Sequence, residues 1–203
     1  MAVKLTKNEQ KLQKDRLKQY QRYLPTLQLK KQQLQMVIRQ ISAEVASLKK
    51  KQEALVQDMQ TWIAVYHENT AFASELKVEK LIKIDKVVKA KGNIAGVTIP
   101  VFKELTFVPI SYNLADYPLW VDKGLESLRD LARYDALIAT LEQQVRLLEK
   151  ELRTTSQRVN LFEKVKIPEA KDNIRRIAIY LGDQQTAAVV RGKIAKKKLM
   201  QGA

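Results

Sequence analysis

The sequence predicts a mainly α-helical protein, built as a long antiparallel two-helix coiled coil with a small middle insert that contains a β-hairpin. Two apolar repeats predict the helices, because each steps alternately by three and four residues and so has the 3.5-residue period of a coiled-coil seam. The stretch between them is rich in β-branched residues and turn signals, which predicts strands. We therefore expect residues 1–76 to form the N-terminal helix, 77–117 the insert and 118–203 the C-terminal helix with a basic tip, together one elongated domain.

The N-terminal helix is predicted from a repeat that runs from Leu17 to Tyr66. At 1.5 Å per residue this repeat spans roughly 75 Å, too long for the core of a compact domain, so it needs a partner helix of similar length. Thr6 is the expected N-cap, and Glu9 three residues later would complete a capping box. The main seam positions assigned to this helix are Leu24, Leu27, Leu34, Ile38, Ile41, Val45, Leu48 and Leu55.

A proline interrupts this repeat at position 25. It removes the helical hydrogen bond to the carbonyl of Gln21, which costs roughly 3 kcal/mol in a helix interior. The seam keeps its phase across Pro25, so the spacing predicts one kinked helix rather than two helices joined by a loop.

The pattern changes in the insert, where Ile82, Ile84 and Val88 alternate with other residues as they would on one face of a strand. The segment Lys91-Gly92-Asn93 and Gly96 are turn signals, because glycine and asparagine tolerate positive φ. Further short strands are expected at 97–102 and 106–110, where Pro100 and Pro109 restrict them to sheet edges. Because the insert is too small for much of a core of its own, we expect it to pack on the helices.

The second helix is predicted to begin near residues 118–122 and to end in a basic segment. Its seam slips by one residue across Pro168 and resumes at Ala170. The seam positions assigned to it are Ile138, Leu141, Val145, Leu148, Leu152, Val159 and Phe162. The basic tip consists of Arg191, Lys193, Lys196, Lys197 and Lys198.

The two helices are expected to pair antiparallel, because a compact insert returns the chain close to the point where the first helix ended. If Phe72 and Trp120 lie at one level, Pro25 lies opposite Ile167, next to Pro168. Both prolines would then mark one height of the coiled coil.

The chemistry-bearing motifs argue against catalysis. The sequence has no cysteine, and His67 is its single histidine, more simply explained as an ordinary surface or interfacial residue than as a ligand. It contains no phosphate-binding loop, nucleophile elbow or HExxH motif, so we expect no catalytic residue, cofactor or metal site. The start lacks the apolar segment of a secretory signal, and no apolar run approaches 18 residues, which predicts a cytoplasmic protein without membrane insertion.

The formal net charge of +15 fits three kinds of partner: nucleic acid, an anionic membrane surface, or an acidic protein sleeve. A solvated, lysine-rich helical surface explains the same charge without any partner. Charge alone does not separate these interpretations.

Several short segments of the sequence resemble those of a known protein family. The segment 158–168, RVNLFEKVKIP, resembles the C-terminal signature of the D subunit of the V-type ATPases, and Leu5-Thr6-Lys7 looks like that family's N-terminal start. The segment from Gly96 to Pro100 resembles its middle element. The segments LPTLQLKK at residues 24–31 and LFEKVKIPE at 161–169 look most similar to the bacterial branch of the family. The signature residues are Arg158, Val159, Asn160, Ile167 and Pro168, with Gly96 and Pro100 in the insert.

One departure from the family lies after the last leucine of the seam. The family usually has an acidic stretch there, whereas this chain has Gly182 followed by Asp-Gln-Gln-Thr-Ala-Ala. A glycine weakens a helix interior by about 1 kcal/mol relative to alanine, which questions the rigidity of the tip.

The resemblance implies a non-catalytic rotor subunit, the axle in the central stalk of a V-type ATP synthase/ATPase. Its implied partners are the A and B subunits of the catalytic head, the F subunit, and the subunit that joins the stalk to the membrane ring. The axle would couple ATP synthesis or hydrolysis to proton or sodium transport, on the cytoplasmic side and peripheral to the cell membrane.

Three alternatives use the same helices. A basic coiled-coil protein that binds nucleic acid or an anionic membrane would show steep salt dependence, but it does not need the segment 158–168. An F-type gamma subunit is also an axle, yet an insert of about 40 residues is too short for its Rossmann-like domain. A homodimeric tether is distinguished by the mass of the chain expressed alone.

Overall fold

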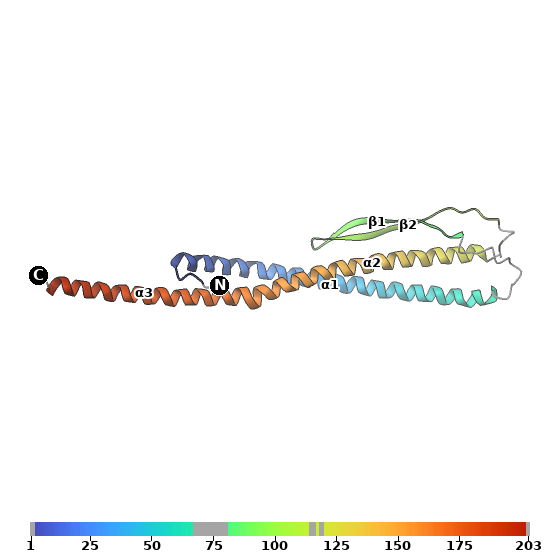
Figure 1. The fold of residues 1–203 in the computed structure, drawn as a ribbon. Coiled ribbons are helices and arrows are strands. Elements are labelled where there is room, and N and C mark those ends of the chain that lie inside the picture. The colour runs from blue at the N-terminus through green and yellow to red at the C-terminus, as the bar shows by residue number, and fades with distance from the viewer. Residues whose placement is uncertain (1–2, 67–80, 114–116, 118–119, 202–203) are drawn as a thin grey trace. The chain divides into compact units, whose positions relative to one another are not determined.

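The computed structural model describes residues 3–66, 81–113, 117 and 120–201, with the side chains of 62–66 left aside (Figure 1). His67 and Phe72 lie outside these residues. The fold is mainly helical with a central antiparallel hairpin, as predicted. Its elements are α1 (Lys7–Tyr66), β1 (Ile84–Ile94), β2 (Val97–Phe107), α2 (Val121–Leu161), the π-helical turn η3 (Phe162–Lys166) and α3 (Ile167–Gln201).

The start of α1 is capped as predicted, although only half of the capping box forms. The backbone N–H of Glu9 donates to the Thr6 hydroxyl over 3.3 Å. The Glu9 carboxylate accepts instead from the Gln13 amide, at 2.9 Å. The helix then continues through Pro25 without a loop, which confirms a single helix, and the kink stays a prediction.

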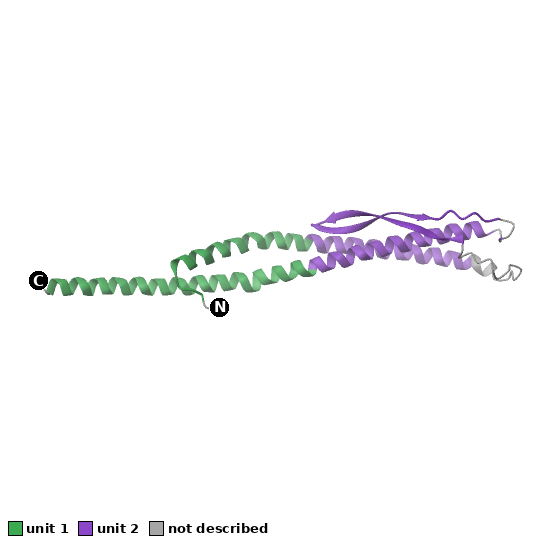
Figure 2. Cartoon of the chain, turned by 45° about the horizontal axis from the view of Figure 1, so that its top comes forward, with its two compact units in different colours: residues 1–32, 153–203 green, residues 33–152 purple. Residues whose placement is uncertain are grey.

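Contacts divide the chain into two compact units, coloured separately in Figure 2. Unit 1 consists of residues 1–32 and 153–203, and unit 2 of residues 33–152. Helices α1 and α2 contribute to both units.

The core of unit 2 lies between the second part of α1, the first part of α2 and the hairpin. Two side-chain pairs show that these helix segments are antiparallel: Lys49 pairs with Glu142 at 2.8 Å, and the Gln52 amide donates to Asp135 at 2.6 Å. The hairpin contributes Ile99, which is 3 % exposed. The buried members of this cluster are Leu34, Ile41, Ile99, Leu141 and Leu148.

The hairpin differs from the prediction at its turn and along its second strand. Ala95 and Gly96 form the turn with φ of 51° and 80°, and the Gly96 N–H donates to the Asn93 side chain. The predicted turn at 91–93 was wrong, because these residues pair within β1. Gly92 serves packing instead: a Cβ there would lie 2.8 Å from Cγ2 of Val101.

The two further strands expected at 97–102 and 106–110 are one strand, β2. Lys103 and Glu104 resemble a break in the sequence, yet the pairing shifts between Val88 and Lys89 so that β2 carries one extra residue there. Such a bulge lets a strand continue through charged residues that face solvent.

A second cluster of unit 2 joins residues on both sides of the hairpin in the sequence to the start of α2. Leu81, Val121 and Leu125 are its buried members, and Tyr112 packs against them. The Tyr112 hydroxyl donates to the Asp122 carboxylate. This hydrogen bond, with partial desolvation and the negative charge of Asp122, raises the pKa of the Tyr112 hydroxyl.

Unit 1 pairs the first part of α1 with the end of α2, η3 and α3. The rings of Tyr20 and Phe162 stack with centroids 5.3 Å apart. Pro25, five residues further along α1, therefore lies level with Gln157 in an antiparallel pair. The predicted level of Pro25 with Ile167 was wrong, because it assumed that paired positions sum to about 192 along the whole helix, whereas Tyr20 and Phe162 sum to 182.

The π turn η3 stands where the sequence predicts a slip of one residue. The backbone N–H of Ile167 donates to the carbonyl of Phe162, five residues earlier, instead of four as in an α-helix. Pro168 follows directly and has no N–H to donate. On either side of the turn the buried residues of unit 1 are Thr155, Val159, Ala170 and Ile177.

Candidate interaction surfaces

The residues assigned to the two seams lie inside the helix pairs of their units, and none of them is exposed. Leu34, Ile41, Ile138, Leu141, Leu148 and Val159 are buried. The half-buried members are Leu24, Leu27, Ile38, Val45, Leu48, Leu55, Val145, Leu152 and Phe162. The seams therefore pack within the chain, and other faces remain for partners.

In unit 2 the hairpin is attached to α2 by a contact that the sequence analysis missed. Gln144 is buried, and its side-chain amide donates to the carbonyl of Pro100 over 2.5 Å. Lys89 reaches Gln143 next to it, with 3.5 Å between nitrogen and oxygen. Because the amide bonds a backbone carbonyl, this contact fixes the level of β2 along α2.

A signal for this attachment is present in α2. Leu137, Thr140 and Gln144 follow one another by three and four residues, beside the seam residue Leu141. This second stripe widens the buried face of α2 beyond a two-helix seam, which is typical of a helix with two neighbours. The Thr140 hydroxyl is satisfied within the helix, by the carbonyl of Ala136 at 2.7 Å.

Between the helices of unit 2, one ion pair has a clear electrostatic effect. The Lys49 ammonium hydrogen-bonds Glu142, and this bond with its positive charge lowers the pKa of the Glu142 carboxyl. Both side chains remain largely exposed, so the pair contributes little to stability at neutral pH.

The most accessible surface of unit 1 is the end of α3, which continues past the start of α1 (Figure 1). Every residue from Ala188 to Gln201 is exposed. The sequence has no acidic residue after Asp183. The basic tip thus consists of exposed cations: Arg191, Lys193, Lys196, Lys197 and Lys198.

Apolar side chains lie among these cations. Val189, Val190, Ile194, Leu199 and Met200 are all exposed, Leu199 to 77 %. A helix that exposes both bulky apolar and cationic side chains is suited to a surface that is apolar in part and acidic in part. The helix is continuous through Gly182, where an added Cβ would meet nothing within 4 Å.

A comparison with protein families gives these surfaces a context. The family of the ATP synthase D subunit matches residues 9–197. This chain belongs to the ATP synthase D-subunit family. The resemblance inferred from the segment 158–168 is thereby confirmed.

Named relatives of the chain agree with this family. The D subunit of the V-type ATP synthase of Borreliella burgdorferi is 50% identical over 199 residues, which cover 98% of this chain and 96% of that protein. The protein of the same name from Chlamydia pneumoniae is 36% identical over 206 residues, with 98% and 94% covered. That from Chlamydia muridarum is 36% identical over 203 residues, with 98% and 97% covered.

Seen in this family, the signature residues 158–168 span the end of α2, the π turn and the start of α3. Val159 is buried and Ile167 half-buried, whereas Arg158, Asn160 and Pro168 are exposed. In the hairpin, Gly96 is exposed at the turn and Pro100 is half-buried against α2.

Among the residues that the structure describes, no helix is both long and apolar enough to cross a membrane. The same residues contain no group of three or more histidine, cysteine or carboxylate side chains placed to hold a metal ion.

Proposed function

We propose that this chain is the central-stalk rotor subunit of a V-type ATP synthase/ATPase, and that it couples ATP synthesis or hydrolysis in the head mechanically to proton or sodium transport through the membrane ring. The observation that carries the proposal is a helix pair whose C-terminal helix ends as a single exposed, basic and apolar segment, in a chain of the D-subunit family. In this role the chain is non-catalytic and has no cofactor of its own.

The antiparallel helices of each unit suit a part that transmits torque. Apolar seams resist the separation of two helices, and cross-helix contacts such as Lys49–Glu142 and Tyr20–Phe162 oppose sliding. Two different helices also present different faces around their common axis. A rotor of this kind acts on catalytic interfaces that are otherwise equivalent, one after another.

The partners in this proposal are the A and B subunits of the head, the F subunit, and the subunit that joins the stalk to the membrane ring. The basic tip of α3 would lie in an acidic and partly apolar sleeve of the head, where complementary charge guides assembly. The chain would be cytoplasmic and peripheral to the cell membrane.

The charge of the tip is tested by replacing Lys196, Lys197 and Lys198 together by alanine. In membrane vesicles that contain the whole complex, we expect less ATP-driven ion pumping, or less assembled complex. The matched control replaces the same three residues by arginine, which keeps the charge and should pump normally. Unchanged pumping in the alanine variant would contradict the role of the tip.

The rotor assignment itself is tested by tagged purification from native membranes in mild detergent, followed by intact-complex mass spectrometry. We expect one copy of this chain beside three A and three B subunits. Recovery of nucleic acid would contradict the rotor and favour the alternative, a basic coiled-coil protein that binds nucleic acid or an anionic membrane. Recovery of a homodimer without ATPase subunits would also contradict the rotor, and it would favour a homodimeric tether.

A further inference from the structure

The helix pair of unit 1 contains one residue more than a regular seam requires. From Thr155, a step of seven residues leads to Phe162, and further steps of seven lead to Glu169 and Arg176. Both of the latter are exposed. The buried residues are instead Ala170 and Ile177, each one position later.

The π turn supplies this extra residue. In η3 the N–H of Ile167 bonds the carbonyl of Phe162, so one turn holds an additional residue and the helix beyond it rotates back into phase. The turn contains no buried residue, and Val165 within it is 48 % exposed. The extra residue therefore adds no contact to the core of unit 1.

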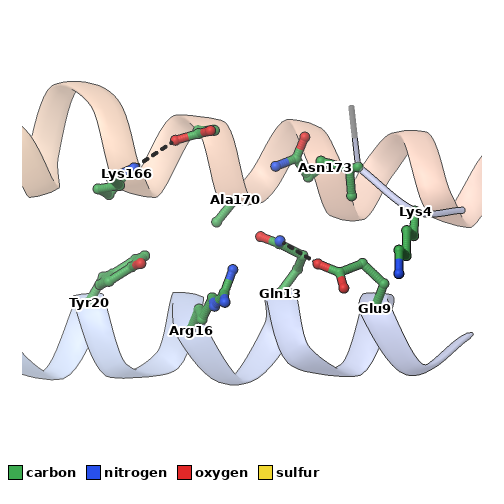
Figure 3. A pocket seen from close by; sticks show the side chains of 10 residues that line it. Lys4, Glu9, Gln13, Arg16, Tyr20, Lys166, Ala170 and Asn173 are labelled. Atoms are coloured by element: carbon green, nitrogen blue, oxygen red, sulfur yellow. Dashed lines mark hydrogen bonds and ion pairs between the residues drawn. The ribbon is translucent and has the colours of Figure 1, made fainter. Parts of the chain in front are cut away.

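A mostly polar hollow of this helix pair begins at Lys166, the last residue of the π turn. It has a volume of about 380 Å³ and lies between the first turns of α1 and the start of α3, with Tyr20 and Lys166 at one end (Figure 3). Arg16 and Gln13 line it from α1, opposite Ala170 and Asn173 on α3 (Figure 3). Polar groups that line such a hollow are suited to hold water, which replaces dry packing between the helices.

Each of the two hydrogen bonds drawn in Figure 3 joins residues that are close in sequence, on the same side of the helix pair. Gln13 donates to Glu9 on α1, and Lys166 to Glu169 across the junction of η3 and α3 (Figure 3). Neither bond joins one helix of the pair to the other, so neither opposes their separation.

We propose that η3 is a compliant joint of the helix pair, at which unit 1 opens and twists before its flanking segments do. The extra residue in η3 corrects the heptad phase, and the π turn is maintained by the register of the seam rather than by Pro168. The joint combines a turn that has non-standard hydrogen bonding and no buried residue with an adjacent hollow lined mostly by polar side chains, which are properties of segments that open locally. The inference stands independently of the proposed rotor function.

The first experiment deletes Val165 from the full-length chain. Removal of one residue from the π turn moves Ala170 and Ile177 back into the heptad phase of Thr155 and Phe162 along a regular α-helix. We expect a melting temperature within about 3 °C of the wild type, or above it. The matched control deletes Lys18, an exposed residue in a regular part of α1, and should lower the melting temperature by more than about 5 °C. Equal losses in both variants, or a failure of the Val165 deletion to fold, would overturn the proposal.

The second experiment measures amide hydrogen exchange in the same proteins. We expect residues 163–169 to exchange at least about tenfold faster than residues 153–161 in the wild type, and this difference to vanish when Val165 is deleted. Pro168→Ala at full length should keep the fast exchange, since the extra residue remains. Slow exchange at 163–169 in the wild type would show that there is no joint. Slow exchange there in Pro168→Ala alone would show that the proline produces the joint.

Discussion

The ring of Tyr20 stacks on the ring of Phe162, with an interplanar angle of 27°, at the first residue of the π turn. This stack joins the two helices of unit 1, and it defines which residues of the antiparallel pair face each other. The energetic coupling of the two rings can be measured separately from the burial of each ring.

We expect Tyr20→Leu and Phe162→Leu to show a coupling of about 0.5–1.5 kcal/mol in a double-mutant cycle, because stacked aromatic pairs contribute this much beyond area burial. The free energy of unfolding of the wild type, both single variants and the double variant would be measured by urea denaturation. Additive effects, within about 0.3 kcal/mol, would show that the stack does not hold the register.

Gly92 should not tolerate a side chain. An added methyl group would lie 2.8 Å from Val101 across the hairpin, so we expect Gly92→Ala to reduce the free energy of unfolding by about 1–3 kcal/mol through overpacking. The loss should appear in denaturation monitored by a probe in the hairpin. A neutral or stabilising result would mean that the Val101 side chain moves aside without cost, which would contradict the packing role of Gly92.

Gly182→Ala should have the opposite sign. Here a Cβ meets nothing within 4 Å and the residue lies inside α3, so alanine should favour the helix by about 1 kcal/mol. Amide exchange of residues 180–190 should slow in the isolated chain, and circular dichroism should show that the variant retains more helix than the wild type on heating. Faster exchange in this segment would contradict the continuous α3.

The hairpin should depend on Gln144. Gln144→Ala leaves the carbonyl of Pro100 without its donor at a buried contact, which costs about 1–3 kcal/mol. We also expect faster amide exchange along β2. Gln143→Ala is the matched control, since this neighbour is exposed and should change stability by less than about 0.5 kcal/mol. Similar effects of both substitutions would remove the assigned role of Gln144.

The pair Lys49–Glu142 predicts a pH dependence. The hydrogen bond from Lys49 favours the ionised carboxyl of Glu142 and lowers its pKa in the folded chain. Its stabilisation is therefore present above the pKa of the unfolded chain and is lost as pH falls through the lower folded value. Carboxyl-carbon NMR titration should place Glu142 below the ordinary glutamate value of about 4.3. In Lys49→Met it should return toward that value, and an unchanged titration would rule out this cause.

Some features of the fold follow from sequence alone because they are local. The cap at Thr6 requires a hydroxyl three residues before Glu9, and both lie in one turn. The slip after Phe162 is visible because heptad phase counts residues along a single helix. For the same reason the basic tip could be located before any partner helix was known.

The hairpin shows where local reasoning fails. Lys103 and Glu104 look like a break, and Gly92 like a turn, as long as each is considered in its own strand. The bulge and the close approach to Val101 exist only when β1 and β2 are paired, because they depend on which residue stands opposite.

By itself, then, the sequence determined the helices, the phase slip and the family, since periodicity and motif spacing are properties of one continuous segment. The antiparallel order of the helices followed from the short length of the insert between them. The tertiary structure decided the rest: that Tyr20 faces Phe162, that Gln144 holds Pro100, and that the slip is absorbed by a π turn before Pro168. These contacts join residues far apart in the chain, and their alignment depends on the summed lengths of everything between them. If one helix is displaced by a few residues along the other, its seam pattern stays the same, but every residue faces a different partner.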